Sequence, residues 1–238
     1  YALVVGNISK GLEFFVVENL YSEYNWFVFV LPLMILVGFM VYKGVRNIAR
    51  VGEIVYWAIV IGLIYIALKA LSGVDVLSFL PFFKDGFKPL VNSAWIHLSW
   101  FGSATFMFML FGFVDFREEK KSRMIKYIIF AILIVQLLYF VFYGLFGVTC
   151  PTHNYCISDI SQFSSTYSAI DELSWLVVSM WIVAQAIQLA LFSYCIAQAL
   201  KFLFDMKDNW IPTIIVMLYL LAWSFIGENT IRMEQIFF

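Results

Sequence analysis

Charged side chains are scarce in this sequence. Lysine, arginine, aspartate and glutamate make up 13% of its 238 residues, whereas an average soluble domain carries about 25%. Four long stretches contain none of these residues: 25–42, 94–114, 173–200 and 210–226. Two more, 54–71 and 125–148, each contain a single lysine near one end. A protein folded in water exposes charge at shorter intervals, so the scarcity excludes an ordinary soluble domain.

Cysteine and histidine are also few, and their spacing excludes a familiar kind of metal site. His153 lies between Cys150 and Cys156 in TCPTHNYC, but no second group of such residues completes the four ligands of a structural zinc. We therefore expect no metal site. Cys150 and Cys156 either form a disulfide in an oxidising compartment or remain two free thiols, because spacing alone does not fix pairing.

Signatures of catalysis are missing as well. The sequence has no GxSxG and no P-loop, and its carboxylates lie almost entirely outside the apolar stretches. Apart from Lys69 and Lys126 near the ends of two stretches, the polar groups inside them are neutral, and Gln185 and Gln188 share one helix face. Hydrogen bonding between helices explains that pair more simply than a water-lined path does. We expect no enzymatic activity and no cofactor.

Hydrophobic residues are what the sequence has in abundance, at 63% of the chain. A helix needs roughly 20 apolar residues to cross a bilayer, and each of the six stretches reaches or approaches that length. A more polar first segment, 2–20, is interrupted by Asn7, Lys10 and Glu13, which predicts a partial helix or one buried in a bundle. The fold class expected is therefore an all-α polytopic membrane protein.

Basic residues predict the orientation of the chain. They gather after the first apolar stretch, at 116–126, and at Lys201 and Lys207, whereas 149–168 has none. Because cytoplasmic loops are enriched in lysine and arginine, we expect these three basic segments in the cytoplasm and 149–168 outside. The aromatic segment 74–93 predicts a short interfacial helix with a turn at its Lys-Asp-Gly centre. A long helix is expected from 168–171 to about Phe204.

Small and hydroxyl residues interrupt the apolar stretch 94–114 near its middle. They are Gly102, Ser103, Ala104 and Thr105, which with the preceding Phe101 form the candidate segment in SWFGSATFMF. One interpretation is a packing surface where two helices approach closely. The other is a helix broken near mid-bilayer, whose freed backbone groups bind a small solute, as in several transporter folds. Composition does not choose between the two.

Two motifs resemble the spore germination permease family, the GerAB-type B subunits of nutrient germinant receptors. In VYKGVRNIARVGEIVYW, at 41–57, the matching residues are Lys43, Gly44, Ala49, Arg50, Glu53 and Ile54. In FLPFFKDGFKPLVNSAW, at 79–95, they are Pro81, Gly86 and Pro89. A weaker third match combines 171–183 with 202–216. In the family the first motif marks a cytoplasmic turn between two helices.

The resemblance implies a fold similar to the amino acid–polyamine–organocation transporters, with a LeuT-like inverted repeat. On that mapping we expect 1–238 to form a single transmembrane bundle domain, about helices three to nine of a ten-helix fold cut at both ends. The sixth helix would be the broken one, and 101–105 would be half of a ligand-binding site. Many relatives carry a glutamate where this chain has Ser103, which puts a proton- or cation-linked role at that position in doubt.

The function implied is that of a membrane subunit of a spore nutrient germinant receptor. It would bind a small germinant such as an amino acid in the bacterial cell membrane or spore inner membrane and trigger germination. Its partners would be the receptor's A and C subunits and the lipid bilayer, with no nucleic acid. Two alternatives stay open: a secondary transporter of amino acids or similar solutes, and a structural membrane subunit without a solute site.

Overall fold

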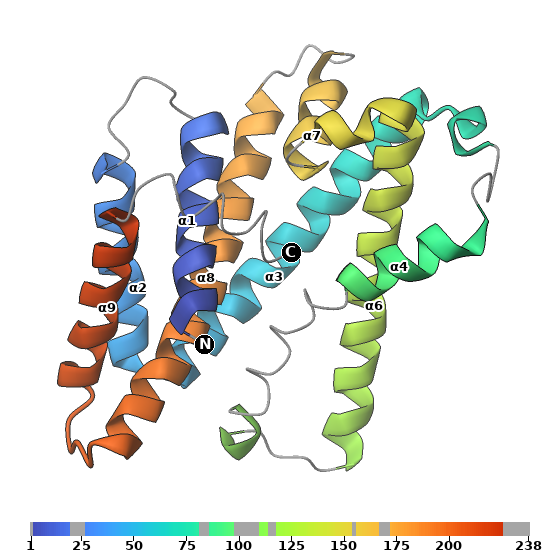
Figure 1. Cartoon of the computed structure of the whole chain (residues 1–238). Coiled ribbons are helices and arrows are strands. Elements are labelled where there is room, and N and C mark those ends of the chain that lie inside the picture. Colours follow the sequence, from blue (N-terminus) through green and yellow to red (C-terminus); the bar gives the residue numbers. More distant parts are fainter. Residues whose placement is uncertain are drawn as a thin grey trace. The chain divides into compact units, whose positions relative to one another are not determined.

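The chain folds into helices, as the computed structural model in Figure 1 shows for residues 2–19, 27–80, 86–97, 110–113, 118–153, 156–166 and 172–225. These ranges contain no β-strand. Three helical segments are long and apolar enough to cross a membrane, Val45–Gly73, Ser122–Thr152 and Val178–Leu203, and two shorter apolar helices are Val30–Lys43 and Trp210–Phe225. The chain is therefore an all-α polytopic membrane protein, as predicted.

The chain divides into two compact units, and α3 and α8 contribute residues to both. The first unit comprises Tyr1–Ile54, Val91–Gly112 and Ile182–Phe238. It contains α1 (Ala2–Asn19), α2 (Phe27–Lys43), the start of α3 (Val45–Ala70), most of α8 (Glu172–Leu203) and α9 (Trp210–Phe225). Most of α4 (Phe87–His97) and part of the 3₁₀ turn η4 (Phe111–Phe113) also belong to it.

In the first unit α9 packs against both α1 and α2, and the three lie side by side in Figure 1. Two glycines permit this close packing. A Cβ on Gly6 would lie 2.8 Å from the Trp223 ring, and one on Gly38 would lie 3.2 Å from Met217. Val5, Val37, Leu189 and Leu220 are among the buried residues of the core that these helices form with α8.

The second unit comprises Val55–Leu90 and Phe113–Trp181. Four elements of this unit pack against α6 (Glu118–Phe146). They are the 3₁₀ helices η1 (Leu71–Gly73), η2 (Val76–Phe79) and η5 (Gly147–Thr152), and α7 (Cys156–Thr166). Phe79 stacks on Phe140 of α6, with ring centroids 5.0 Å apart. The N–H of Asp75 donates to the carbonyl of Gly144 over 2.9 Å, so η2 is fixed to α6 by both contacts.

Most predicted helices occur where the sequence placed them. The segment 2–20 forms α1, the first apolar stretch forms α2, and the long helix expected to end near Phe204 is α8, which ends at Leu203. At 32 residues and 1.5 Å each, α8 is about 48 Å long, well beyond a hydrocarbon core of roughly 30 Å. In the expected interfacial segment 74–93 the structure has η2 and the start of α4.

Two expectations were wrong in detail. The basic loop expected after the first apolar stretch consists of Gly44 alone, because α3 already begins at Val45 and carries Arg46 and Arg50 on helix. The polar segment 149–168, expected to be a loop, contains the helix α7. Its Ser158 and Ile160 are 2% and 0% exposed, so a serine-rich sequence still presents a buried face toward α6.

Candidate functional site

The ligand-binding residues predicted from the sequence lie outside the described residues. They are Phe101, Gly102, Ser103, Ala104 and Thr105. The flanking described elements are α4, which ends at His97, and a short segment that resumes at Leu110. The broken helix and its solute site therefore stay predictions.

Gly44 of the first motif forms the turn between α2 and α3. Gly44 has φ +88°, in the left-handed region that only glycine adopts readily. Its N–H donates to the carbonyls of Met40, over 3.2 Å, and Val41, over 3.1 Å. Its own carbonyl accepts from the N–H groups of Asn47 and Ile48 at 3.1 and 3.3 Å. One residue thus ends α2, starts α3 and satisfies backbone groups of both.

The other motif residues have less defined surroundings. Arg50 and Glu53 are exposed on α3. Gly86 has φ +75° directly before α4, and the other residues of the predicted Lys-Asp-Gly turn lie outside the described residues. Pro89 lies in the first turn of α4, where a missing N–H costs no helical hydrogen bond. Pro81 lies outside the described residues.

A charged pair lies inside the first unit, between α1 and α9. The Nζ of Lys10 is 3.2 Å from Oε2 of Glu13, and the two side chains are only 12% and 11% exposed. The same Nζ donates to the backbone carbonyl of Ser224 over 2.5 Å. The Ser224 hydroxyl donates to Oε2 of Glu13 over 2.9 Å. Each of these three residues, Lys10, Glu13 and Ser224, therefore contacts the other two.

Charges enclosed in a membrane bundle are costly, and they usually mark a functional or structurally decisive position. Sequence reasoning treated Lys10 and Glu13 only as interruptions of an apolar segment. Their spacing of three, with opposite charges on one helix face, was the available signal. Ser224 could not have been identified, since it is an ordinary serine in an apolar stretch until the fold brings it to α1.

The region beside this network continues the contact between α1 and α9. The Tyr219 hydroxyl donates to the carbonyl of Ala2 over 2.9 Å, and the Trp223 ring lies against Gly6. The Trp223 Nε1 is buried, and no partner for it occurs within the described ranges. Tyr219, Trp223 and Ser224 of α9 thus contact α1 in the same order as the residues they meet there, so the two helices run parallel.

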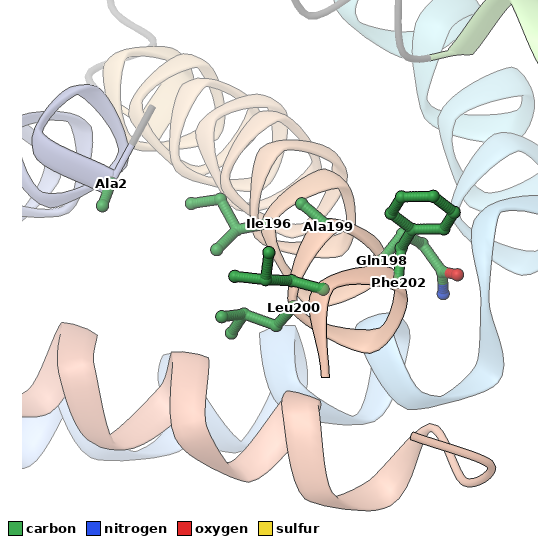
Figure 2. A pocket seen from close by; sticks show the side chains of 7 residues that line it. Ala2, Ile196, Gln198, Ala199, Leu200 and Phe202 are labelled. Atoms are coloured by element: carbon green, nitrogen blue, oxygen red, sulfur yellow. The ribbon is translucent and has the colours of Figure 1, made fainter. Parts of the chain in front are cut away.

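A cavity of about 510 Å³ lies where α1 begins and α8 ends. Figure 2 shows Ile196, Ala199 and Leu200 of α8 with Ala2 of α1, and Gln198 beside Phe202. Gln198 carries the only polar side chain among the lining residues. An amino acid has two charged groups to satisfy, so this cavity is poorly suited to bind one.

The predicted outer segment carries Cys150, Cys156 and His153. Cys150, Cys156 and Cys195 have free thiols. Burial, with Asp159 and Cys150 nearby, raises the pKa of Cys156 to about 12. The Nδ1 of His153 lies 3.3 Å from Oδ2 of Asp159. In the part of the chain that the structure describes, no three His, Cys, Asp or Glu side chains converge as metal ligands would.

Comparison with known protein families gives a match over most of the chain. A family model described as "Spore germination protein" matches residues 2–231, which is nearly the whole chain and includes the Gly44 turn, the Lys10 network and the stretch 101–105. No curated protein and no solved structure matches the chain.

Proposed function

Because the chain belongs to the spore germination protein family, we propose that it is the membrane subunit of a spore nutrient germinant receptor. In this proposal it binds a small germinant such as an amino acid and works with the receptor's A and C subunits. It crosses the bacterial cell membrane or spore inner membrane several times, with its basic segments in the cytoplasm and a LeuT-like arrangement of helices.

The observation that carries this proposal is the family match over residues 2–231 of an all-α membrane protein. Two structural details support it. The glycine turn lies at Gly44, in the motif whose resemblance to the family implies a turn between helices. The network of Lys10, Glu13 and Ser224 gives an apolar bundle the kind of enclosed polar contact that membrane transport and sensing proteins retain.

The proposed site is the predicted break at 101–105. Gly102 would supply the backbone freedom, and the N–H and C=O groups released from the helix would bind the carboxylate and ammonium of an amino acid. Sensing requires only that the ligand bind one conformation of the receptor more tightly than another. The signal then follows from the shift in population, and the ligand itself need not cross the membrane.

The test compares two glycine variants in proteoliposomes, with binding and uptake of radiolabelled L-amino acids and sugars as the measurements. Gly102→Leu fills the space that a ligand would need and disfavours the break. Gly112→Leu is the matched control, since a Cβ at Gly112 meets nothing within 4 Å. We expect saturable binding without accumulation, lost in Gly102→Leu and kept in Gly112→Leu, with both variants inserting normally.

Other results would redirect the assignment. Uptake driven by an ion gradient would make the protein a secondary transporter. Binding that survives in Gly102→Leu would remove 101–105 from the site. A protein that binds no small solute, while spores lacking it fail to respond to nutrient, would be a structural subunit of the receptor.

A further inference from the structure

A polar cleft lies at the end of the first unit where α2 stops, α8 stops and α9 starts. Its volume is about 510 Å³. Basic side chains dominate the lining, which includes Lys43, Lys201 and Lys207 against a single acidic residue, Asp208. Three positive charges and one negative leave an excess of two, so the cleft is suited to an anionic group.

The backbone around the cleft is held by specific contacts. Asp205 has φ 48°, and the N–H groups of Phe204 and Met206 donate to carbonyls in the last turn of α8. Lys201 donates to Oδ1 of Asn209 over 2.7 Å. The Asn209 carbonyl in turn accepts from both the N–H and the hydroxyl of Thr213 in the first turn of α9. The Lys201 side chain is therefore held in position at the cleft.

The first turn of α9 adds to the attraction for anions. Helix N-termini carry a partial positive charge and free N–H groups, and α9 begins at Trp210, a lining residue of the cleft. On the other side Lys43 lies over the rings of Phe39 and Tyr42, with Nζ at 5.4 and 5.9 Å from their centroids. The aromatic faces keep this ammonium at the end of α2.

An apolar groove of about 400 Å³ adjoins the cleft and runs between α2 and α9. Ile35, Ile214 and Leu218 line it, and Tyr42 and Trp210 line both the groove and the cleft. Those two rings meet edge to face, with centroids 5.4 Å apart. Tyrosine and tryptophan are typical of the boundary between headgroups and hydrocarbon. The cleft and the groove are thus joined at an aromatic pair of the kind found at the boundary between headgroups and hydrocarbon.

We propose that the cleft and groove together bind one anionic phospholipid. The phosphate headgroup lies among Lys43, Lys201 and Lys207, and an acyl chain lies along α2 and α9. Basic pockets between transmembrane helices bind phosphate headgroups in this way. A free phosphate or other small anion would use the cleft and leave the apolar groove without a role. The groove is therefore the feature that favours a lipid.

The test measures binding to the purified protein in mild detergent by native mass spectrometry and by thermal unfolding. The probes are dioleoylphosphatidylglycerol, dioleoylphosphatidylcholine and inorganic phosphate. We expect the anionic lipid to bind most tightly and raise the unfolding temperature most. Lys207→Gln, which changes an exposed side chain, should weaken that binding about fivefold, the effect of one lysine near an anionic lipid surface. Lys126→Gln, an exposed lysine on α6 outside the cleft, is the matched control.

A second variant tests the groove independently of charge. Ile214→Trp adds a ring where an acyl chain would lie, and it should weaken the lipid without changing the affinity for inorganic phosphate. Equal stabilisation by inorganic phosphate and by the anionic lipid would overturn the proposal in favour of a simple anion site. So would equal binding of the two lipids, or a lipid affinity that neither Lys207→Gln nor Ile214→Trp reduces.

Discussion

The Nζ of Lys10 donates a hydrogen bond to the backbone carbonyl of Ser224, a residue 214 positions later in the chain. The contact joins α1 to α9, and Glu13 completes it by pairing with the ammonium and accepting from the Ser224 hydroxyl. Within the first unit this network fixes the axial position of α1 relative to α9. Apolar packing alone specifies that position less sharply.

Removing one charge of the pair should harm the protein more than removing both. Lys10→Met leaves the enclosed Glu13 carboxylate without its ammonium, which costs roughly 3 kcal/mol for a buried pair. In the double variant Lys10→Met/Glu13→Gln no charge remains to desolvate, so stability should return most of the way. Thermal unfolding in detergent of the two single variants and the double variant measures the coupling.

Lys69→Met is the control for this cycle, because Lys69 is exposed in the last turn of α3. It should change the free energy of unfolding by no more than about 0.5 kcal/mol, as most surface substitutions do. Additive effects of Lys10→Met and Glu13→Gln would contradict the interaction between them.

Gly44→Ala should destabilise the turn between α2 and α3. An alanine forced to φ +88° costs about 1 kcal/mol. The strain comes from the backbone and not from crowding, since a Cβ there would meet only Tyr194 at 4.0 Å. The unfolding temperature of the purified variant measures the effect.

Gly52→Ala provides the comparison for that substitution. Gly52 lies within α3, and its added Cβ would meet Ile187 at an ordinary 3.8 Å, so alanine should be neutral or stabilising there. If Gly44→Ala were as stable as Gly52→Ala, the turn would have another backbone conformation available.

Cys156 should react slowly with alkylating reagents. The thiolate is the nucleophile, and with the pKa raised to about 12 little thiolate is present at mildly alkaline pH. Iodoacetamide should therefore modify Cys156 at least about 100-fold more slowly than an exposed cysteine introduced by Thr152→Cys, whose pKa should be near 8.5. The rate at Cys156 should still be rising with pH where the rate at the exposed cysteine has levelled off.

The same measurement decides the pairing that spacing left open. After denaturation without reductant, Cys150 and Cys156 should both accept the label, as free thiols do. If neither reacted until a reductant was added, the two would be joined by a disulfide.

The proposed orientation predicts which side of the membrane each end of α6 faces. A membrane-impermeant maleimide applied to intact cells should label Thr152→Cys and leave Arg123→Cys unlabelled, with the unmodified protein as the background. Both positions are exposed on the protein, so burial does not confuse the comparison. The reverse pattern would invert the assignment of the basic segments to the cytoplasm.

Helix positions could be read from the sequence because a bilayer permits few alternatives. An apolar run long enough to cross hydrocarbon has to satisfy its own backbone hydrogen bonds, and a helix does so; hence 25–42 and 210–226 correspond closely to α2 and α9. Helix ends were less predictable. The start of α3 carries Arg46 and Arg50, and charge does not end a helix at a membrane surface.

Contacts between distant segments could not be predicted. The spacing of Lys10 and Glu13 was visible, but their partner Ser224 is chosen by the packing of α1 against α9. The cleft likewise needed Lys43 to lie near Lys201 and Lys207, residues far apart in the chain. Local patterns specify elements, whereas such sites depend on which helix faces meet.

The single residue between α2 and α3 also bears on how the protein enters its membrane. With no spacer at Gly44, insertion of one helix places the start of the next at the same membrane surface. We therefore expect α2 and α3 to partition from the translocation machinery together. Lys43 and Arg46, held on either side of the bend, would resist transfer across the bilayer and retain that end of both helices on the side of synthesis.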